Sequence, residues 1–213
     1  RVVVVTGIGK SFSAGGDINY MRRMGSFSYD ENLADAALLA DMLKTLNFMP
    51  KPTIARVKGA AMGGGVGLAC CCDFAIGTAA TRFALSEVKL GLTPATISPY
   101  VVRTLGERNA RRLFLSGQPV LGQQALQLGL LDHVVEEDQL DTAVAALCET
   151  LLKNSPNAMK VSKELVFRVS EGEIDQDMID YTIKCIADVR DSEEGREGTT
   201  AFLEKRSPSW IKD

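Results

Sequence analysis

The stretch AMGGGVGLACCCD, residues 61–73, places four glycines directly before an apolar run with three consecutive cysteines. Glycine allows another chain segment or a ligand to come close to the backbone, because it has no Cβ. The small apolar residues after the glycines predict a short buried helix, whose first N–H groups have no partner within the helix. The chain must therefore fold so that something approaches this helix N-terminus closely.

The cysteines next to these glycines do not have the spacing of a disulfide framework or a zinc site. The chain has five cysteines, an odd number, and three of them are adjacent. We interpret Cys70, Cys71 and Cys72 as packing residues of the helix, because free buried cysteine behaves as a small hydrophobe. A reducing compartment fits this usage best.

Strand-like and helical segments alternate over roughly the first two thirds of the chain, and helical segments follow. This order predicts an α/β fold with a parallel sheet and a helical C-terminal third. The predicted strands are residues 2–5, 53–62, 73–78 and 81–92 and a short one before residue 136. The clearest predicted helices are residues 30–46, 140–154, 156–170, 174–192 and 195–205.

Composition excludes several classes of function. Hydrophobic residues make up 46% and charged residues 24%, and the net charge of −3 comes without basic clusters, so we expect no nucleic-acid partner. No apolar stretch has the length of a membrane span, so we expect no membrane partner. The sequence begins inside a strand-like run and without methionine, so we expect the first elements of the fold to precede it.

The candidates for proton transfer are carboxylates. His133 is the only histidine, and no catalytic triad or two-histidine metal motif can be built from it. Glu87 stands in the apolar run RFALSEVKLGL. Burial there raises the pKa of a carboxyl group and suits it to acid–base work. Alternatively, Glu87 lies on the solvent face of an alternating strand, and the pattern leaves both interpretations open.

Two glycine loops could complement such a carboxylate. The N–H of Gly64 at the predicted helix start and that of Gly16 in SAGGD are candidate donors. Two donors that converge on one oxygen form an oxyanion hole, which stabilises a developing enolate. The alternative is that both glycine clusters only form tight turns.

Three blocks, FSAGGDI, KGAAMGGGVGLACCCDFAIGTAATRFALSEVKLGL and REGTTAFLEKRSPSW, follow each other in this order. Together they resemble the enoyl-CoA hydratase/isomerase (crotonase) superfamily over essentially the whole chain. The resemblance implies an α/β spiral of ββα units, here N-terminally incomplete, over residues 1–154. It implies a helical oligomerisation region over residues 155–213, which drives assembly into a trimer or a hexamer built as a dimer of trimers.

The resemblance also implies the site. It places the two oxyanion N–H groups on Gly16 and Gly64, and it makes Glu87 the general acid/base. It puts Ala14, Gly67 and Lys205 at the substrate, with the lysine reaching the CoA of a neighbouring subunit. The substrate is an acyl-CoA thioester, and neither a metal nor another cofactor is implied.

This sequence departs from the resemblance at Gly67, where hydratases with two glutamates carry their first carboxylate. The stretch SEVKLGLTPATISPYVVRTLGERNARR is similar to a subgroup of hydratases that act on branched, carboxylated enoyl-CoA of the methylglutaconyl or isohexenylglutaconyl kind. We therefore interpret the chain as such a hydratase, and we expect Gly67 to make room for the acyl group. A single-glutamate enoyl-CoA isomerase is the alternative, and a non-catalytic acyl-CoA-binding oligomer is a third. The expected location is the cytoplasm of a bacterium, and the mitochondrial matrix stays open.

Three smaller expectations concern the segments around these blocks. Asp17 is expected to cap the helix that follows it, because aspartate is a good N-cap. Arg22 and Arg23 are expected either to face CoA phosphates or to lie on an exposed helix face. Phe202 is expected to pack in the contact between subunits.

Overall fold

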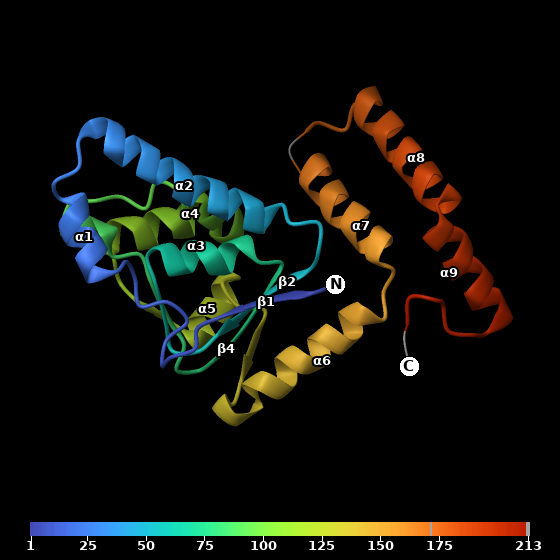
Figure 1. The fold of residues 1–213 in the computed structure, drawn as a ribbon, viewed down its shortest axis with the longest axis horizontal. Helices are drawn as coiled ribbons and strands as arrows, with labels where there is room; N and C mark the ends of the chain where they lie inside the picture. The colour runs from blue at the N-terminus through green and yellow to red at the C-terminus, as the bar shows by residue number, and fades with distance from the viewer. Residues whose placement is uncertain (171, 212–213) are drawn as a thin grey trace. The chain divides into compact units, whose positions relative to one another are not determined.

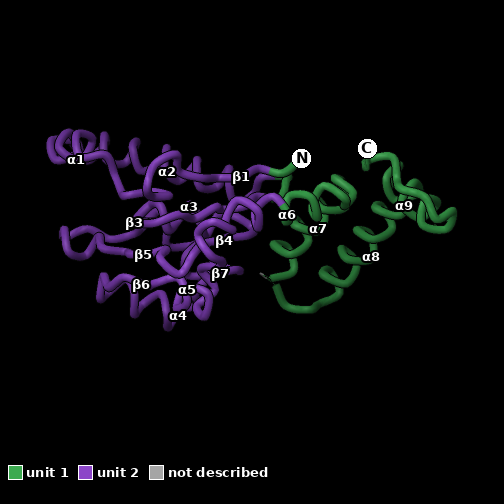
Figure 2. Tube along the Cα trace, turned by 90° about the horizontal axis from the view of Figure 1, so that it is seen from below, with its two compact units in different colours: residues 1–2, 50–52, 146–213 green, residues 3–49, 53–145 purple. Residues whose placement is uncertain are grey.

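The computed structural model describes residues 1–170 and 172–211 of the chain (Figure 1). These residues form two compact units (Figure 2). The larger unit comprises residues 3–49 and 53–145, and the helical unit comprises residues 1–2, 50–52 and 146–213. We describe each unit by itself.

A four-stranded parallel sheet runs through the larger unit, in the order β1-β2-β4-β7. Its central strands consist almost entirely of buried residues, as expected for a parallel sheet with both faces covered. The expectation of a parallel α/β arrangement is therefore confirmed. The strands are β1 (Val3–Thr6), β2 (Thr53–Val57), β4 (Phe74–Thr78) and β7 (His133–Val135).

A second sheet contains three short strands, in the order β3-β5-β6. These are β3 (Ala60–Met62), β5 (Arg82–Ala84) and β6 (Val120–Leu121). The continuous strand predicted over residues 53–62 is therefore wrong, because the chain leaves one sheet for the other at Gly59. Gly59 has φ +63°, and a Cβ there would lie 2.2 Å from the Lys10 carbonyl oxygen. Only glycine fits such a turn without strain.

The helices of the larger unit pack around α3, which begins where β3 ends. Helix α3 contacts both α2 and α4 (Figure 1). The predicted helix over residues 30–46 is confirmed as α2, which a Ser28–Glu31 capping box starts. The helices are α1 (Ile18–Met24), α2 (Tyr29–Asn47), α3 (Gly64–Cys71), α4 (Ser98–Ser116) and α5 (Gly122–Leu128).

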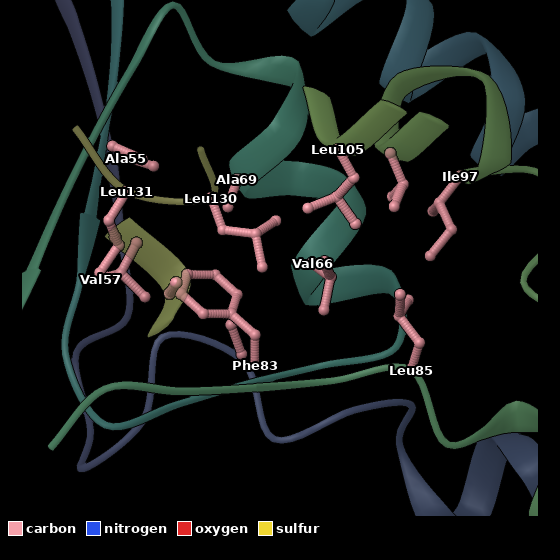
Figure 3. Close-up of a cluster of buried hydrophobic side chains, with 14 of the residues drawn as sticks. Ala55, Val57, Val66, Ala69, Phe83, Leu85, Ile97, Leu105, Leu130 and Leu131 are labelled. Carbon is pink, nitrogen blue, oxygen red and sulfur yellow. The ribbon is translucent and has the colours of Figure 1, made fainter. Parts of the chain in front are cut away.

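The hydrophobic core of the larger unit lies against α3 (Figure 3). Gly65, Val66, Gly67, Ala69 and Cys71 are the buried residues of this helix. Their small volumes let neighbouring elements come close to its axis, which explains why glycines and cysteines replace larger apolar residues. The predicted short buried helix is confirmed.

The cysteines of this stretch are not joined in disulfides within the described ranges. Cys71 is buried, and Cys72 forms the C-cap of α3. Desolvation raises the pKa of the Cys70 thiol to about 12, so it stays protonated and unreactive at neutral pH. The interpretation of these cysteines as packing residues is consistent with this environment.

The helical unit contains the end of α6 (Leu140–Leu152) and three further helices. These are α7 (Pro156–Val169), α8 (Gln176–Asp191) and α9 (Glu193–Glu204). Ser155, Asp175 and Ser192 cap the last three, each accepting a hydrogen bond from a backbone N–H in the first turn. Within the described ranges, no helix is long and apolar enough to cross a membrane.

Candidate active site

The first candidate donor lies at the N-terminus of α3. Gly63 is the N-cap, with φ 53°, and its N–H donates to the Ala84 carbonyl oxygen at 2.8 Å. Gly64 follows as the first helical residue, so its own N–H has no acceptor within the helix. Apart from its chain neighbours and the backbone of α3, none of the described residues has a heavy atom within 4 Å of the position that a Cβ on Gly64 would occupy. The helix therefore presents this N–H with open space beside it.

The second candidate loop, residues 13–16, runs beside the strand that leads into α3. The Ser13 N–H donates to the Ala60 carbonyl oxygen at 2.9 Å, and the Ser13 carbonyl oxygen accepts from the Met62 N–H at 2.9 Å. Gly15 follows with φ +108° and turns the backbone before Gly16. The structure thus brings the SAGGD loop next to the helix start, as two converging donors require.

Ser13 and Gly65 make the contact that fixes these two segments. A Cβ on Gly65 would lie 2.5 Å from the Ser13 Cβ and 2.8 Å from its Oγ. Gly65 therefore has a packing role, because any side chain there would push the loop away from α3. The interpretation of the glycines as close-approach residues is correct for this position.

Glu87 is the first residue of a 3₁₀ turn, η1 (Glu87–Leu90), which follows β5. The expectation of a strand over residues 81–92 is wrong beyond Ala84, and so is the alternative that placed Glu87 on the solvent face of that strand. Leu92 N–H donates to the Glu87 carbonyl oxygen at 3.0 Å, and Gly91 ends the turn with φ 72°. A left-handed glycine is a common way to end such a turn.

The Glu87 carboxyl group lies against the N-cap of α3. Its Oε1 is 3.1 Å from the position that a Cβ on Gly63 would occupy, so a side chain at Gly63 would displace it. Its Oε2 is buried, and it has no hydrogen-bond partner among the described residues. Burial raises the pKa of the Glu87 carboxyl, as the first interpretation of this residue predicts.

Gly67 is buried one turn further along α3. A Cβ there would lie 2.2 Å from Cγ2 and 2.6 Å from Cβ of Ile97. The expectation that Gly67 leaves room for the acyl group is therefore corrected: Ile97 fills that volume.

The model of the enoyl-CoA hydratase/isomerase family matches residues 1–213. The chain belongs to the enoyl-CoA hydratase/isomerase family.

Relatives and solved structures agree with this family. A short-chain-enoyl-CoA hydratase of Clostridium acetobutylicum is 32% identical over 213 residues, which are 99% of this chain and 80% of that protein. An enoyl-CoA hydratase from Shewanella pealeana has a solved structure with a TM-score of 0.95 and 47% identity, over 98% of this chain and 78% of that chain. The solved structure of an enoyl-CoA hydratase/isomerase from Marinobacter aquaeolei gives a TM-score of 0.93 at 34% identity, over 100% of this chain and 82% of that chain. The predicted superfamily, its α/β fold and the expectation of an enzyme are confirmed.

Other predicted positions of this hydratase/isomerase family member lie as follows. Ala14 is exposed on the loop between Ser13 and Gly15. Lys205 belongs to the helical unit, where it follows α9 with φ 56°. His133 is exposed on β7. No cluster of His, Cys, Asp and Glu that could hold a metal occurs in the described part of the chain. The substrate roles of Ala14 and Lys205 remain predictions.

The expectation for Asp17 is confirmed. It is the N-cap of α1, and its Oδ1 accepts from the Tyr20 N–H at 2.8 Å. Arg22 and Arg23 are exposed on the same helix, and Phe202 is exposed on α9.

Two residues that shape the site are absent from the sequence-based predictions. Ser13 was present in the FSAGGDI block, but only its contact with Gly65 gives it a role. Ile97 stands in a Pro-rich turn with no chemical signal of its own. A glycine at a helical position, Gly67, was the one hint that a neighbour had to be accommodated.

The Ser13–Gly65 contact gives a first prediction. Gly65→Ala is expected to lower the free energy of unfolding by about 1–3 kcal/mol through overpacking. It should also lower kcat by about tenfold or more, because the donor loop shifts from its position. Thermal unfolding and steady-state kinetics measure both effects. Adding Ser13→Gly should restore much of each loss, and Gly9→Ala, at a position with nothing within 4 Å, is the matched control.

The environment of Glu87 gives a second prediction, on stability against pH. The pKa of Glu87 is raised in the folded state, so the folded chain binds this proton more tightly than the unfolded chain. Its contribution to stability is therefore present below the unfolded pKa and is lost as pH rises through the folded pKa. Glu87→Gln should be more stable relative to the wild type at pH 8 than at pH 5 in urea unfolding. Glu136→Gln, at an exposed position of the same unit, is the matched control for the change from carboxylate to amide.

Proposed function

We propose that this enzyme adds water across the 2,3 double bond of an enoyl-CoA thioester with a branched or carboxylated acyl group, of the methylglutaconyl or isohexenylglutaconyl type. One observation carries the hydration chemistry of this proposal: the Glu87 carboxyl lies against Gly63, directly before Gly64, whose N–H has no acceptor within α3. The type of acyl group is supported by the similarity of residues 86–112 to hydratases that act on such thioesters. A buried carboxylate oxygen without a partner is costly, and bound water or substrate would satisfy Oε2.

The proposed role of the two backbone donors is to hold the thioester oxygen. Gly64 donates from the positive end of α3, and Gly16 donates from the adjacent loop. Negative charge grows on this oxygen as the double bond is attacked, so the donors stabilise the transition state more than the substrate. Each such donor is typically worth about 3 kcal/mol.

The proposed role of Glu87 is to move one proton. Its carboxylate takes a proton from water while the water oxygen bonds to C3. The π electrons of the double bond move toward the thioester oxygen and form the enolate. Glu87 then returns the proton to C2, and the thioester carbonyl reforms. One water is consumed, and the carboxylate is regenerated. A raised pKa suits a group that must both accept and return this proton.

The second candidate function is double-bond isomerisation. Gly67 supplies no second carboxylate, and this observation favours a reaction that a single carboxylate can complete. Glu87 would remove a proton from C2 of a 3-enoyl thioester and return it at C4. A non-catalytic acyl-CoA-binding oligomer is a weaker candidate, because binding alone does not explain why the Glu87 carboxyl is desolvated at this site.

One experiment separates these functions. The enzyme is incubated with a linear 2-enoyl-CoA, a 3-enoyl-CoA and 3-methylglutaconyl-CoA, and the absorbance of the conjugated thioester is followed. Loss of conjugation from a 2-enoyl substrate supports hydration, and a higher kcat/KM for 3-methylglutaconyl-CoA than for the linear thioester supports the proposed acyl group. If conjugation is gained from the 3-enoyl substrate and the 2-enoyl substrates do not react, the function is isomerisation and not hydration. No change with any thioester overturns both.

The proposed assembly is a homotrimer or a hexamer. Exposed apolar side chains on α8 and α9 support self-association, because water-exposed clusters of this kind are commonly covered by a partner. They include Ile179, Ile183, Phe202 and Leu203. In such an assembly Lys205 is proposed to reach a neighbouring subunit's CoA. The free cysteines support a reducing, cytoplasmic compartment.

A further inference from the structure

Glu87 lies against the N-cap of α3, Gly63, and Ile97 lies against Gly67 in the same helix. Gly63 is the N-cap of α3, and Gly67 lies four residues further on, about one helical turn along the axis. Glu87 Oε1 lies 3.1 Å from the Cβ position of Gly63, and Ile97 Cγ2 lies 2.2 Å from that of Gly67. Side chains on a helix lean toward its N-terminus. A side chain at position 67 would therefore lean toward the Glu87 carboxyl, and Ile97 stands in its way.

Ile97 is held firmly in this place. It is 2% exposed and belongs to the same hydrophobic core as Val66 and Leu85. Figure 3 shows Ile97 and Leu85 reaching toward the first turns of α3, which carry Val66. Ile97 is also the N-cap of α4, and its carbonyl oxygen accepts from the Val101 N–H at 3.1 Å. Its β-branched side chain has few rotamers, so it cannot turn aside for a larger residue at position 67.

We propose that Ile97 determines the reaction specificity of this enzyme by closing the helix face beside Glu87 with hydrocarbon. Because no second acid or base can enter from position 67, Glu87 exchanges protons with substrate and water without a second carboxyl from α3. Gly67 and Ile97 are then a coupled pair, because the Ile97 side chain fits against α3 only when position 67 has no side chain. This inference rests on the proposed acyl-CoA chemistry at Glu87.

The packing half of the test is a double-mutant cycle read by thermal unfolding. Gly67→Ala is expected to lower Tm by several degrees, because its Cβ meets both Cβ and Cγ2 of Ile97. Ile97→Gly removes both atoms, and glycine is tolerated at an N-cap. In that background Gly67→Ala should leave Tm unchanged or raise it, because it fills the vacated space. A wild-type Tm for Gly67→Ala alone would overturn the proposal.

The chemical half compares two variants with the same packing. Ile97→Gly with Gly67→Glu introduces a carboxyl beside Glu87, and Ile97→Gly with Gly67→Gln introduces an amide of the same shape. The ratio of hydration to isomerisation is measured for each on a 2-enoyl and a 3-enoyl thioester. The Glu form should exceed the Gln form in this ratio by at least about tenfold, at similar KM. Equal ratios in two folded variants would overturn the proposal.

The failure of the proposed function gives a different result. A wild-type enzyme that turns over none of the three thioesters overturns the acyl-CoA chemistry and the inference with it. An active wild type whose Glu and Gln double variants behave alike overturns only the inference. The Tm cycle needs no substrate, so it tests the packing of Gly67 against Ile97 whether or not the acyl-CoA chemistry is correct.

Discussion

Replacing Glu87 by glutamine is expected to lower kcat by about 10²–10⁴-fold, the usual contribution of a general acid–base group. The amide keeps the size and most of the contacts of the side chain, but it can neither take a proton from water nor return one to carbon. Binding should be little changed, because the two backbone donors that hold the thioester oxygen remain. Stopped-flow kinetics give kcat, and calorimetric titration with a saturated acyl-CoA, which cannot react, gives the affinity.

Two further variants make this result specific. Glu87→Asp withdraws the carboxyl from Gly63 by one methylene, so activity between those of the wild type and Glu87→Gln is expected. Glu136→Gln changes an exposed carboxylate of the same unit and should leave kcat unchanged. If Glu87→Gln kept wild-type turnover, the acid–base role of Glu87 would be lost, and another group would have to move the proton.

The pattern of apolar residues predicted most of the elements that surround this carboxyl. The buried strands and α2 have regular spacing of apolar residues, and the short helix follows from glycines before a small apolar run. The same pattern did not predict where Glu87 lies. In RFALSEVKLGL an alternating strand and a strand followed by a 3₁₀ turn place apolar residues in similar positions. Only the turn at Gly91 and the contact with Gly63 decide between them.

The pairing of Gly67 with Ile97 lay beyond sequence reasoning for a different reason. The absence of a side chain can leave space for a ligand or for another residue, and these two cases look identical in a sequence. The distance of 2.2 Å between Ile97 Cγ2 and the Cβ position of Gly67 distinguishes them. The contact joins segments 30 residues apart, and no local periodicity predicts it.

Gly64→Pro is expected to lower kcat by about 10²–10³-fold, because it deletes one oxyanion donor. The substitution should disturb the fold very little at this position. Gly64 is the first residue of α3, where proline is favoured, and no atom lies within 4 Å of its Cβ position. The preceding Gly63 has no Cβ to clash with the proline ring. Circular dichroism and Tm should therefore remain close to those of the wild type while turnover falls.

Gly64→Ala is the matched control, because it adds a carbon at the same position and keeps the N–H. Its kcat should stay well above that of Gly64→Pro, and any crowding of the substrate by the methyl group should raise KM instead. The difference between the two variants isolates the hydrogen bond from the bulk of the new side chain. Equal losses of kcat in both variants would mean that Gly64 is needed only for space. Since charge develops on the thioester oxygen only as the reaction proceeds, a true donor must affect kcat more than affinity.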